Sequence, residues 1–114
     1  MIIKRLEDNP FVDMADHVNI KKQVVIGPVD GSNEIVLRYF KIPPGASSPH
    51  RHHDFPHLVK VGAGKGIVID PDGNEHPLAA GDYVYLHDND PHCFKNNGSE
   101  SFEFICVVPA RGKG

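Results

Sequence analysis

The sequence of 114 residues lacks the long apolar patterns of membrane and secreted proteins. No apolar run approaches the roughly 20 residues that a membrane helix needs. The first residues, MIIKRLEDN, contain no apolar core of the kind found in signal peptides. We therefore expect a cytoplasmic protein with no membrane partner.

The sequence also has no basic run and little cysteine. Its formal net charge is -3, which argues against nucleic acid or an anionic membrane surface as the main partner. The only cysteines are Cys93 and Cys106. Because the cytoplasm keeps thiols reduced, we expect both to be free rather than joined in a disulfide.

The sequence leaves little room for long helices, because 11 glycines and 10 prolines interrupt the chain every few residues. What remains is a series of short β-rich segments separated by turn signals, with one helical turn expected at 11–17. Such spacing favours an all-β sandwich or barrel, formed here as a single domain over 1–114. The expected strands cover 2–6, 22–26, 34–42, 58–61, 66–70, 74–78, 83–87, 92–95 and 101–108.

Histidine is concentrated in one stretch. Four of the 8 histidines occupy positions 50–57, namely His50, His52, His53 and His57. On a strand, residues two apart share a face, so His50 and His52 can converge on one point. Because imidazole is the commonest protein ligand of divalent transition metals, the stretch predicts a metal site.

A second histidine-bearing stretch at 81–96 completes a pattern that resembles the cupin family. The first cupin motif runs G, usually five residues, H-x-H, three or four residues, E, six residues, G. Here it is matched at 45–64 by Gly45, His50, His52, His57 and Gly64. The second motif runs G, five residues, P-x-G, two residues, H, three residues, N. It is matched at 81–96 by Gly81, His87-Asp88-Asn89, His92 and Asn96.

The chain departs from the cupin motifs at a few positions. The first gap is four residues instead of five, and His87 and Asn89 replace the usual proline and glycine. His57 stands where the family has glutamate. An odd offset from His52 would turn His57 away on a regular strand, so a bend near Asp54 is needed. The adjacent His53 is the rival for this ligand position.

The resemblance to small single-domain cupins (the cupin 2, conserved barrel type) implies a double-stranded β-helix, that is, a jelly-roll β-barrel. It also implies one divalent transition metal per chain, with Mn or Fe favoured and Zn or Ni possible. The predicted ligands are His50, His52, His57 and His92. Four neutral imidazoles would leave the +2 charge of the metal uncompensated and attract anionic ligands.

Residues around the predicted site can be named, although none is assigned a catalytic role. Phe104 and Cys106 lie two residues apart, on one face of the last strand, and could either pack in the core or line a pocket. Phe94 is a further pocket candidate. Arg38 shares a strand face with the apolar Phe40, so it is either directed outward or a contact for an anion.

The predicted function is a Mn- or Fe-dependent oxygenase for a small, partly apolar or enolisable substrate. One alternative is a non-catalytic small-molecule sensor or binding protein. The other is a metal-dependent isomerase or lyase, which needs an acid or base such as Tyr85, His53 or Asp54. The apolar N-terminal residues Ile2, Ile3 and Leu6 predict an edge strand that joins a second copy in a homodimer.

Overall fold

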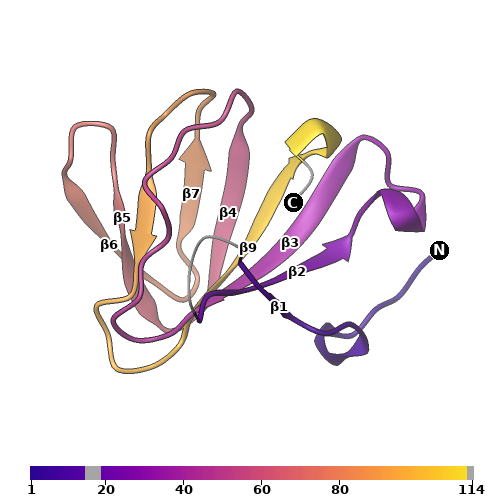
Figure 1. Cartoon of the computed structure of the whole chain (residues 1–114), viewed down its shortest axis with the longest axis horizontal. Helices are drawn as coiled ribbons and strands as arrows, with labels where there is room; N and C mark the ends of the chain where they lie inside the picture. The colour runs from indigo at the N-terminus through magenta and orange to yellow at the C-terminus, as the bar shows by residue number, and fades with distance from the viewer. Residues whose placement is uncertain (15–18, 113–114) are drawn as a thin grey trace.

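Two antiparallel sheets face each other in the computed structural model, which describes residues 1–14 and 19–112 (Figure 1). The larger sheet has the strand order β1-β2-β3-β9-β4-β7, and the smaller has the order β6-β5-β8. This is the all-β jelly-roll barrel predicted from the sequence. The strands are β1 (Val12–Asp13), β2 (Lys21–Ile26), β3 (Ile35–Ile42), β4 (His57–Ala63), β5 (Lys65–Ile69), β6 (Glu75–Ala79), β7 (Tyr83–Leu86), β8 (Cys93–Lys95) and β9 (Phe102–Pro109).

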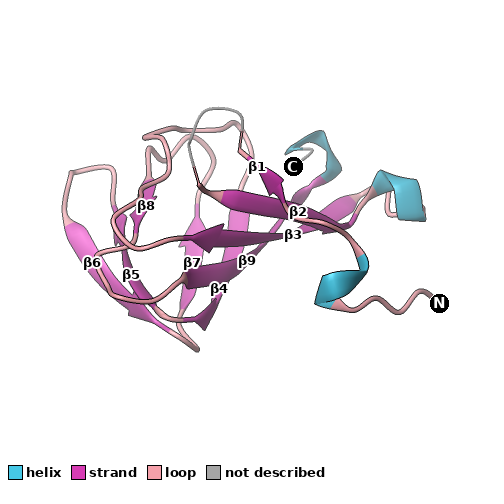
Figure 2. Ribbon diagram, turned by 60° about the horizontal axis from the view of Figure 1, so that its bottom comes forward, coloured by secondary structure: helices cyan, strands magenta, loops and turns pink. Residues whose placement is uncertain are grey.

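Helical structure within the described residues consists of three short 3-10 turns, visible as small coils in Figure 2. They are Leu6–Asp8, Pro28–Asp30 and Ala110–Gly112. None of these helices is long and apolar enough to cross a membrane. The cytoplasmic location inferred from the sequence stays a prediction.

The two central strands of the larger sheet place alternate residues in the space between the sheets. β3 pairs with β9 along its whole length, from Ile35 opposite Pro109 to Ile42 opposite Phe102. Because side chains alternate across a strand, one face of each strand is buried. The buried residues are Val36, Arg38, Phe40 and Ile42 on β3, and Phe102, Phe104, Cys106 and Val108 on β9.

The connection from β4 to β5 explains the glycine that closes the first motif. Gly64 has φ +75, a left-handed conformation that residues with a side chain rarely adopt. A Cβ atom at this position would also lie 2.1 Å from the backbone oxygen of Ser101. The backbone of β4 therefore approaches the start of β9 closely, and this turn admits only glycine.

The second motif ends on a structural residue. The side chain of Asn96 is buried, and its Nδ2 donates to the backbone oxygens of Ile42 at 2.8 Å and Glu100 at 2.7 Å. Its Oδ1 accepts a hydrogen bond from the backbone of Gly98 at 2.9 Å. Asn96 thus fixes the chain that leaves β8 to the end of β3.

The N-terminal segment differs from the prediction. The strand expected at 2–6 does not form; residues 6–8 make a 3-10 turn, and Ile2 and Ile3 are 52% and 71% exposed. Within the described residues this segment has no neighbouring strand to pair with, and Lys4 instead binds Asp30 at 2.8 Å. The helical turn expected at 11–17 falls partly outside the described residues, and Val12–Asp13 forms β1.

Candidate metal centre

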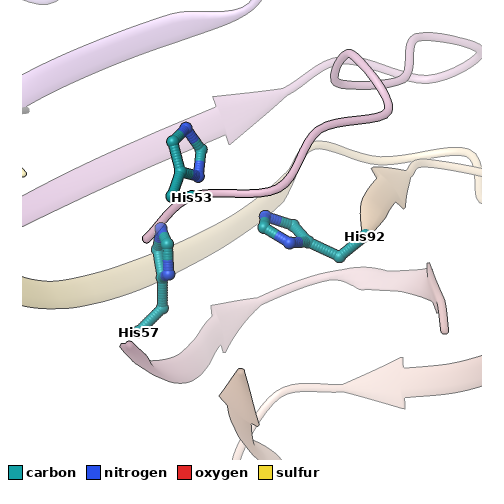
Figure 3. Close-up of side chains that lie close together, drawn as sticks. All are labelled: His53, His57 and His92. Carbon is teal, nitrogen blue, oxygen red and sulfur yellow. The ribbon is translucent and has the colours of Figure 1, made fainter. Parts of the chain in front are cut away.

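Three histidines gather between the two sheets. The ligand nitrogens of His53, His57 and His92 all lie within 4.8 Å of one another, and Figure 3 shows the three rings converging. His57 is the first residue of β4, His53 lies in the loop before it, and His92 comes just before β8. The cluster therefore joins the two motif-bearing stretches across the interior.

A local change of register decides which histidines enter this cluster. The segment before β4 runs antiparallel to the residues around β8, with Ser47 opposite Lys95 and Arg51 opposite His92. A regular register from the first pair would place residue 50 opposite residue 92, so one extra residue is accommodated between the two pairs. Residues directly opposite each other share a face, and Arg51 therefore takes the side of His92.

This register separates the predicted ligands. His57 and His92 lie in the cluster, whereas the side chains of His50 and His52 are exposed and belong to no cluster found within the described residues. His53, treated above as a rival of His57, lies beside it, with ring centroids 5.2 Å apart. The four-histidine ligand set stays a prediction, but the structure gathers a different set of three.

The spacing of the cupin motif agrees with the observed register. Counting from Gly45, the usual gap of five residues leads to Arg51, and the second position of the pair is then His53. Three further residues lead to His57 and six more to Gly64. Arg51 thus stands where the motif has its first histidine, and the one-residue mismatch in the first gap was the sequence signal for it.

Burial keeps the cluster neutral. Burial first, and the nearby positive charge of Arg38 second, lower the pKa of His57 to about 3. Burial is also the main reason that the pKa values of His53 and His92 lie below the ordinary value, with a contribution from Arg51 at His53. Neutral imidazoles are the form that binds a metal.

The hydrogen bonds of the three rings leave nitrogens available for a ligand. Nδ1 of His92 lies 2.9 Å from the backbone oxygen of Asp90, a contact that fixes the ring and leaves Nε2 for the cluster. Nδ1 of His53 and Nδ1 of His57 are buried without a hydrogen-bond partner in the part of the chain described. The backbone of Phe55 raises the pKa of His57, but this is the smallest of the effects on that pKa, which stays low. Unpartnered buried nitrogens in a histidine cluster fit a metal ion.

A cavity of about 300 Å³ opens beside the cluster. All four pocket candidates from the sequence, Arg38, Phe94, Phe104 and Cys106, line it, together with several residues that sequence reasoning did not assign to it. The latter include Phe40, Phe55, Lys22 and Arg51. No aspartate, glutamate or tyrosine is among the described residues of the lining.

Other polar residues considered from the sequence lie elsewhere. Tyr85 is 53% exposed on the outer side of β7, and Asp54 is exposed in the loop before β4. His76 and His87 are exposed as expected, and His17 lies outside the described residues. Cys93 and Cys106 are both free thiols, as predicted.

The fold and the interior cluster define a jelly-roll barrel with a histidine centre. Residues 38–108, more than half of the chain, match the cupin domain family. The chain therefore belongs to the cupin family, and both motifs, at 45–64 and 81–96, lie within the matched region.

Individual proteins are similar to this chain at 19–30% sequence identity. The chain is 30% identical to an oxalate-binding protein of Thermotoga maritima over 60% of its own length and 56% of that protein. It thus spans little more than half of this curated relative. The polyketide cyclase RemF from Streptomyces resistomycificus has a TM-score of 0.85 at 24% identity, over 96% of this chain and 80% of that one. A predicted oxalate decarboxylase of Thermotoga maritima has a TM-score of 0.81 at 19% identity, over 95% and 98%. These two structures support the fold alone.

Proposed function

We propose that the protein is a metal-dependent oxygenase that acts on a small, partly apolar or enolisable organic substrate. The observation that carries the proposal is the cluster of His53, His57 and His92 at the wall of an aromatic cavity. Its ligand set consists of neutral nitrogens, which suit iron, zinc or nickel. Manganese is included because the resemblance to small single-domain cupins implies manganese or iron. A bound manganese or iron ion would supply redox chemistry with O2.

The residues of the chain define how a substrate would be held. Phe94 and Phe104 lie with ring centroids 4.6 Å apart and, with Phe55, give the cavity an apolar wall. Arg38, Lys22 and Arg51 bring positive charge to the lining, which favours a substrate that binds as its anion. The names of the two Thermotoga maritima proteins, which refer to oxalate, agree with a small organic anion as the ligand.

The isomerase or lyase alternative receives less support. Such a reaction needs a positioned proton acceptor or donor. Of the candidates named from the sequence, Tyr85 and Asp54 do not line the cavity, and His53 belongs to the cluster that would hold the metal. Binding without catalysis is the second candidate, since the curated relative is described only as a binding protein. Both alternatives are separated from the oxygenase by the assay below.

The metal site is tested by alanine variants of each histidine. Under the proposed set, His53→Ala, His57→Ala and His92→Ala lose most of the metal, whereas His50→Ala and His52→Ala keep about one ion per chain. The measurement is elemental analysis of protein loaded with manganese and passed through a desalting column. Loss of metal in His50→Ala and His52→Ala with retention in His53→Ala would instead establish the four-histidine set.

The reaction is tested with one protein preparation reconstituted separately with manganese, iron and zinc. O2 consumption is measured with small 1,3-diketones, enols and styrenes. We expect turnover with manganese or iron and none with zinc, which has no redox chemistry. Equal turnover with zinc, or product formed without O2, would favour the isomerase or lyase. Tight binding without turnover for any metal would favour the binding protein.

A further inference from the structure

Arg38 is a buried cation with no anionic partner among the described residues. Its side chain is 8% exposed and lies on the interior face of β3. Burying an arginine is costly unless its charge and its hydrogen-bond donors are satisfied. The contacts of Arg38 therefore show which of its hydrogen-bond donors lack a partner.

The two contacts of the guanidinium are both neutral. Nη2 donates to Sγ of Cys106 at 3.2 Å, and the guanidinium carbon lies 5.2 Å from the ring centroid of Phe40. Burial raises the pKa of the Cys106 thiol, which therefore stays uncharged near neutral pH. Nε of Arg38 is buried and has no hydrogen-bond partner in the described structure. One donor of the guanidinium is thus unused in the described structure, and Arg38 lines the cavity.

A continuous aromatic wall leads from this arginine to the histidine cluster. Phe40, under the guanidinium, stacks on Phe104 with centroids 5.2 Å apart, and Phe104 stacks on Phe94 at 4.6 Å. Phe94 in turn contacts His92, with centroids 6.0 Å apart. A ligand held at Arg38 would therefore extend along an apolar surface toward the three histidines.

We infer that Arg38 binds the carboxylate of the substrate and that the phenylalanine wall holds its apolar part, so that the substrate class is a small apolar or aromatic monocarboxylate. The inference rests on the proposed function only in placing the substrate in this cavity. A planar guanidinium is the side chain best suited to a carboxylate, through charge-assisted hydrogen bonds. Cys106 acts as a positioning residue that orients Nη2.

The phenylalanine wall predicts that this substrate class binds more tightly than oxalate. Oxalate is a compact dianion without an apolar part, so it gains nothing from contact with Phe40, Phe94 and Phe104. The free energy gained from apolar contact grows with the surface removed from water, so an aromatic ring adds a large part of the binding energy. We therefore expect phenylacetate to bind more tightly than oxalate.

The test is calorimetric titration of zinc-loaded protein, which binds substrate without turning it over. The probes are phenylacetate, its neutral analogue phenylacetamide, and oxalate. Wild type is expected to bind phenylacetate at least about tenfold more tightly than the amide, as expected for a hydrogen bond to a charged group. Arg38→Met should weaken phenylacetate binding by about tenfold or more, leave the amide unchanged and retain the zinc.

Matched variants keep the test interpretable. Arg5→Met removes one exposed arginine far from the cavity and should leave all affinities unchanged. Arg38→Lys keeps the charge without the fork and should bind phenylacetate with intermediate affinity, which covers the case of an unfolded Arg38→Met. Cys106→Ala should weaken phenylacetate less than Arg38→Met does, with rescue by Cys106→Ser.

The outcomes separate this inference from the proposed function. Equal affinity for acid and amide, or full phenylacetate affinity in Arg38→Met, would overturn the role of Arg38 even if O2 consumption with a neutral diketone is found. Phenylacetate binding that depends on zinc but not on Arg38 would assign the carboxylate to the metal and also overturn it. Arg38-dependent binding without oxygenase activity would uphold the inference and reject the proposed reaction.

Discussion

At the scale of single residues, His57 carries the largest electrostatic perturbation in the centre. Its pKa is lowered to about 3 in the folded protein, first by burial and then by Arg38. In the unfolded chain the pKa of a histidine is about 6.5. Between these two values the unfolded state binds a proton that the folded state rejects, so stability falls as the pH falls.

We therefore predict that metal-free protein loses stability on acidification below about pH 6.5, by about 1.4 kcal/mol per pH unit for His57 alone. Above that pH the contribution of His57 is constant. The measurement is urea denaturation at pH 7.5, 6 and 5. His57→Phe removes the titrating ring and should reduce this dependence to the part that His53 and His92 contribute, whereas the exposed His76→Gln should not. Parallel curves for wild type and His57→Phe would contradict the prediction.

Residue-level reasoning from the sequence succeeded where periodicity or motif spacing was decisive. The alternation of β9 predicted that Phe104 and Cys106 share a face, and both line the cavity. Motif spacing indicated His57 and His92, and both lie in the cluster, although their role as metal ligands stays a prediction. Period two paired His50 with His52, but a strand pattern does not show where an extra residue is inserted, and both side chains are exposed. The sequence left open whether Arg38 is directed inward or outward. Its packing on Phe40 shows that it is directed inward.

At the scale of the elements, the strands were predicted better than the chain ends. Eight expected strands have counterparts within one or two residues, since each lies between strong turn signals. The hairpin of β5 and β6 was also predicted, and Asp70 closes it by accepting hydrogen bonds from the backbones of Asp72 and Asn74. The strand expected at 2–6 does not form, because apolar residues in the sequence do not by themselves supply a partner strand for pairing.

The turn at Gly64 gives the prediction at this scale. Gly64→Ala is expected to lower the free energy of unfolding by about 1–3 kcal/mol more than Gly73→Ala, because its Cβ would meet the Ser101 backbone. Gly73 has a similar φ of +85 but open space around it, so its variant reports the backbone conformation alone. Denaturant unfolding of both variants measures the difference. Equal losses would show that the contact with Ser101 is relieved without cost.

At the scale of the whole molecule, apolar side chains remain uncovered on the surface. Ile2 and Ile3 are 52% and 71% exposed, and Leu58 and Tyr85 on the outer side of the larger sheet are 56% and 53% exposed. A second copy of the chain would cover such surface. The homodimer predicted from the sequence thus stays a prediction, now without the N-terminal strand that was expected to form it.

We predict a dimer that depends on the N-terminal residues. Removal of residues 1–7 should reduce the mass measured by light scattering to that of one chain or cause aggregation. Because the truncation also removes the ion pair of Lys4 with Asp30, the double variant Ile2→Ser, Ile3→Ser is the cleaner change. Tyr83→Ser serves as the control, at a position 73% exposed on β7, the edge of the larger sheet opposite β1 and β2. A monomeric wild type would refute the prediction.

The extra residue between Ser47 and Arg51 has a further consequence. The tetrapeptide at 50–53 reads His-Arg-His-His, so its two frames present different donors to the interior. In the observed frame they are a guanidinium and one imidazole, whereas in the regular frame they would be two imidazoles. A slip of the backbone by one position would therefore change the charge facing the centre by one unit without altering any amino acid. In this loop, the backbone register determines which side chains face the centre, with the same effect on charge as a substitution.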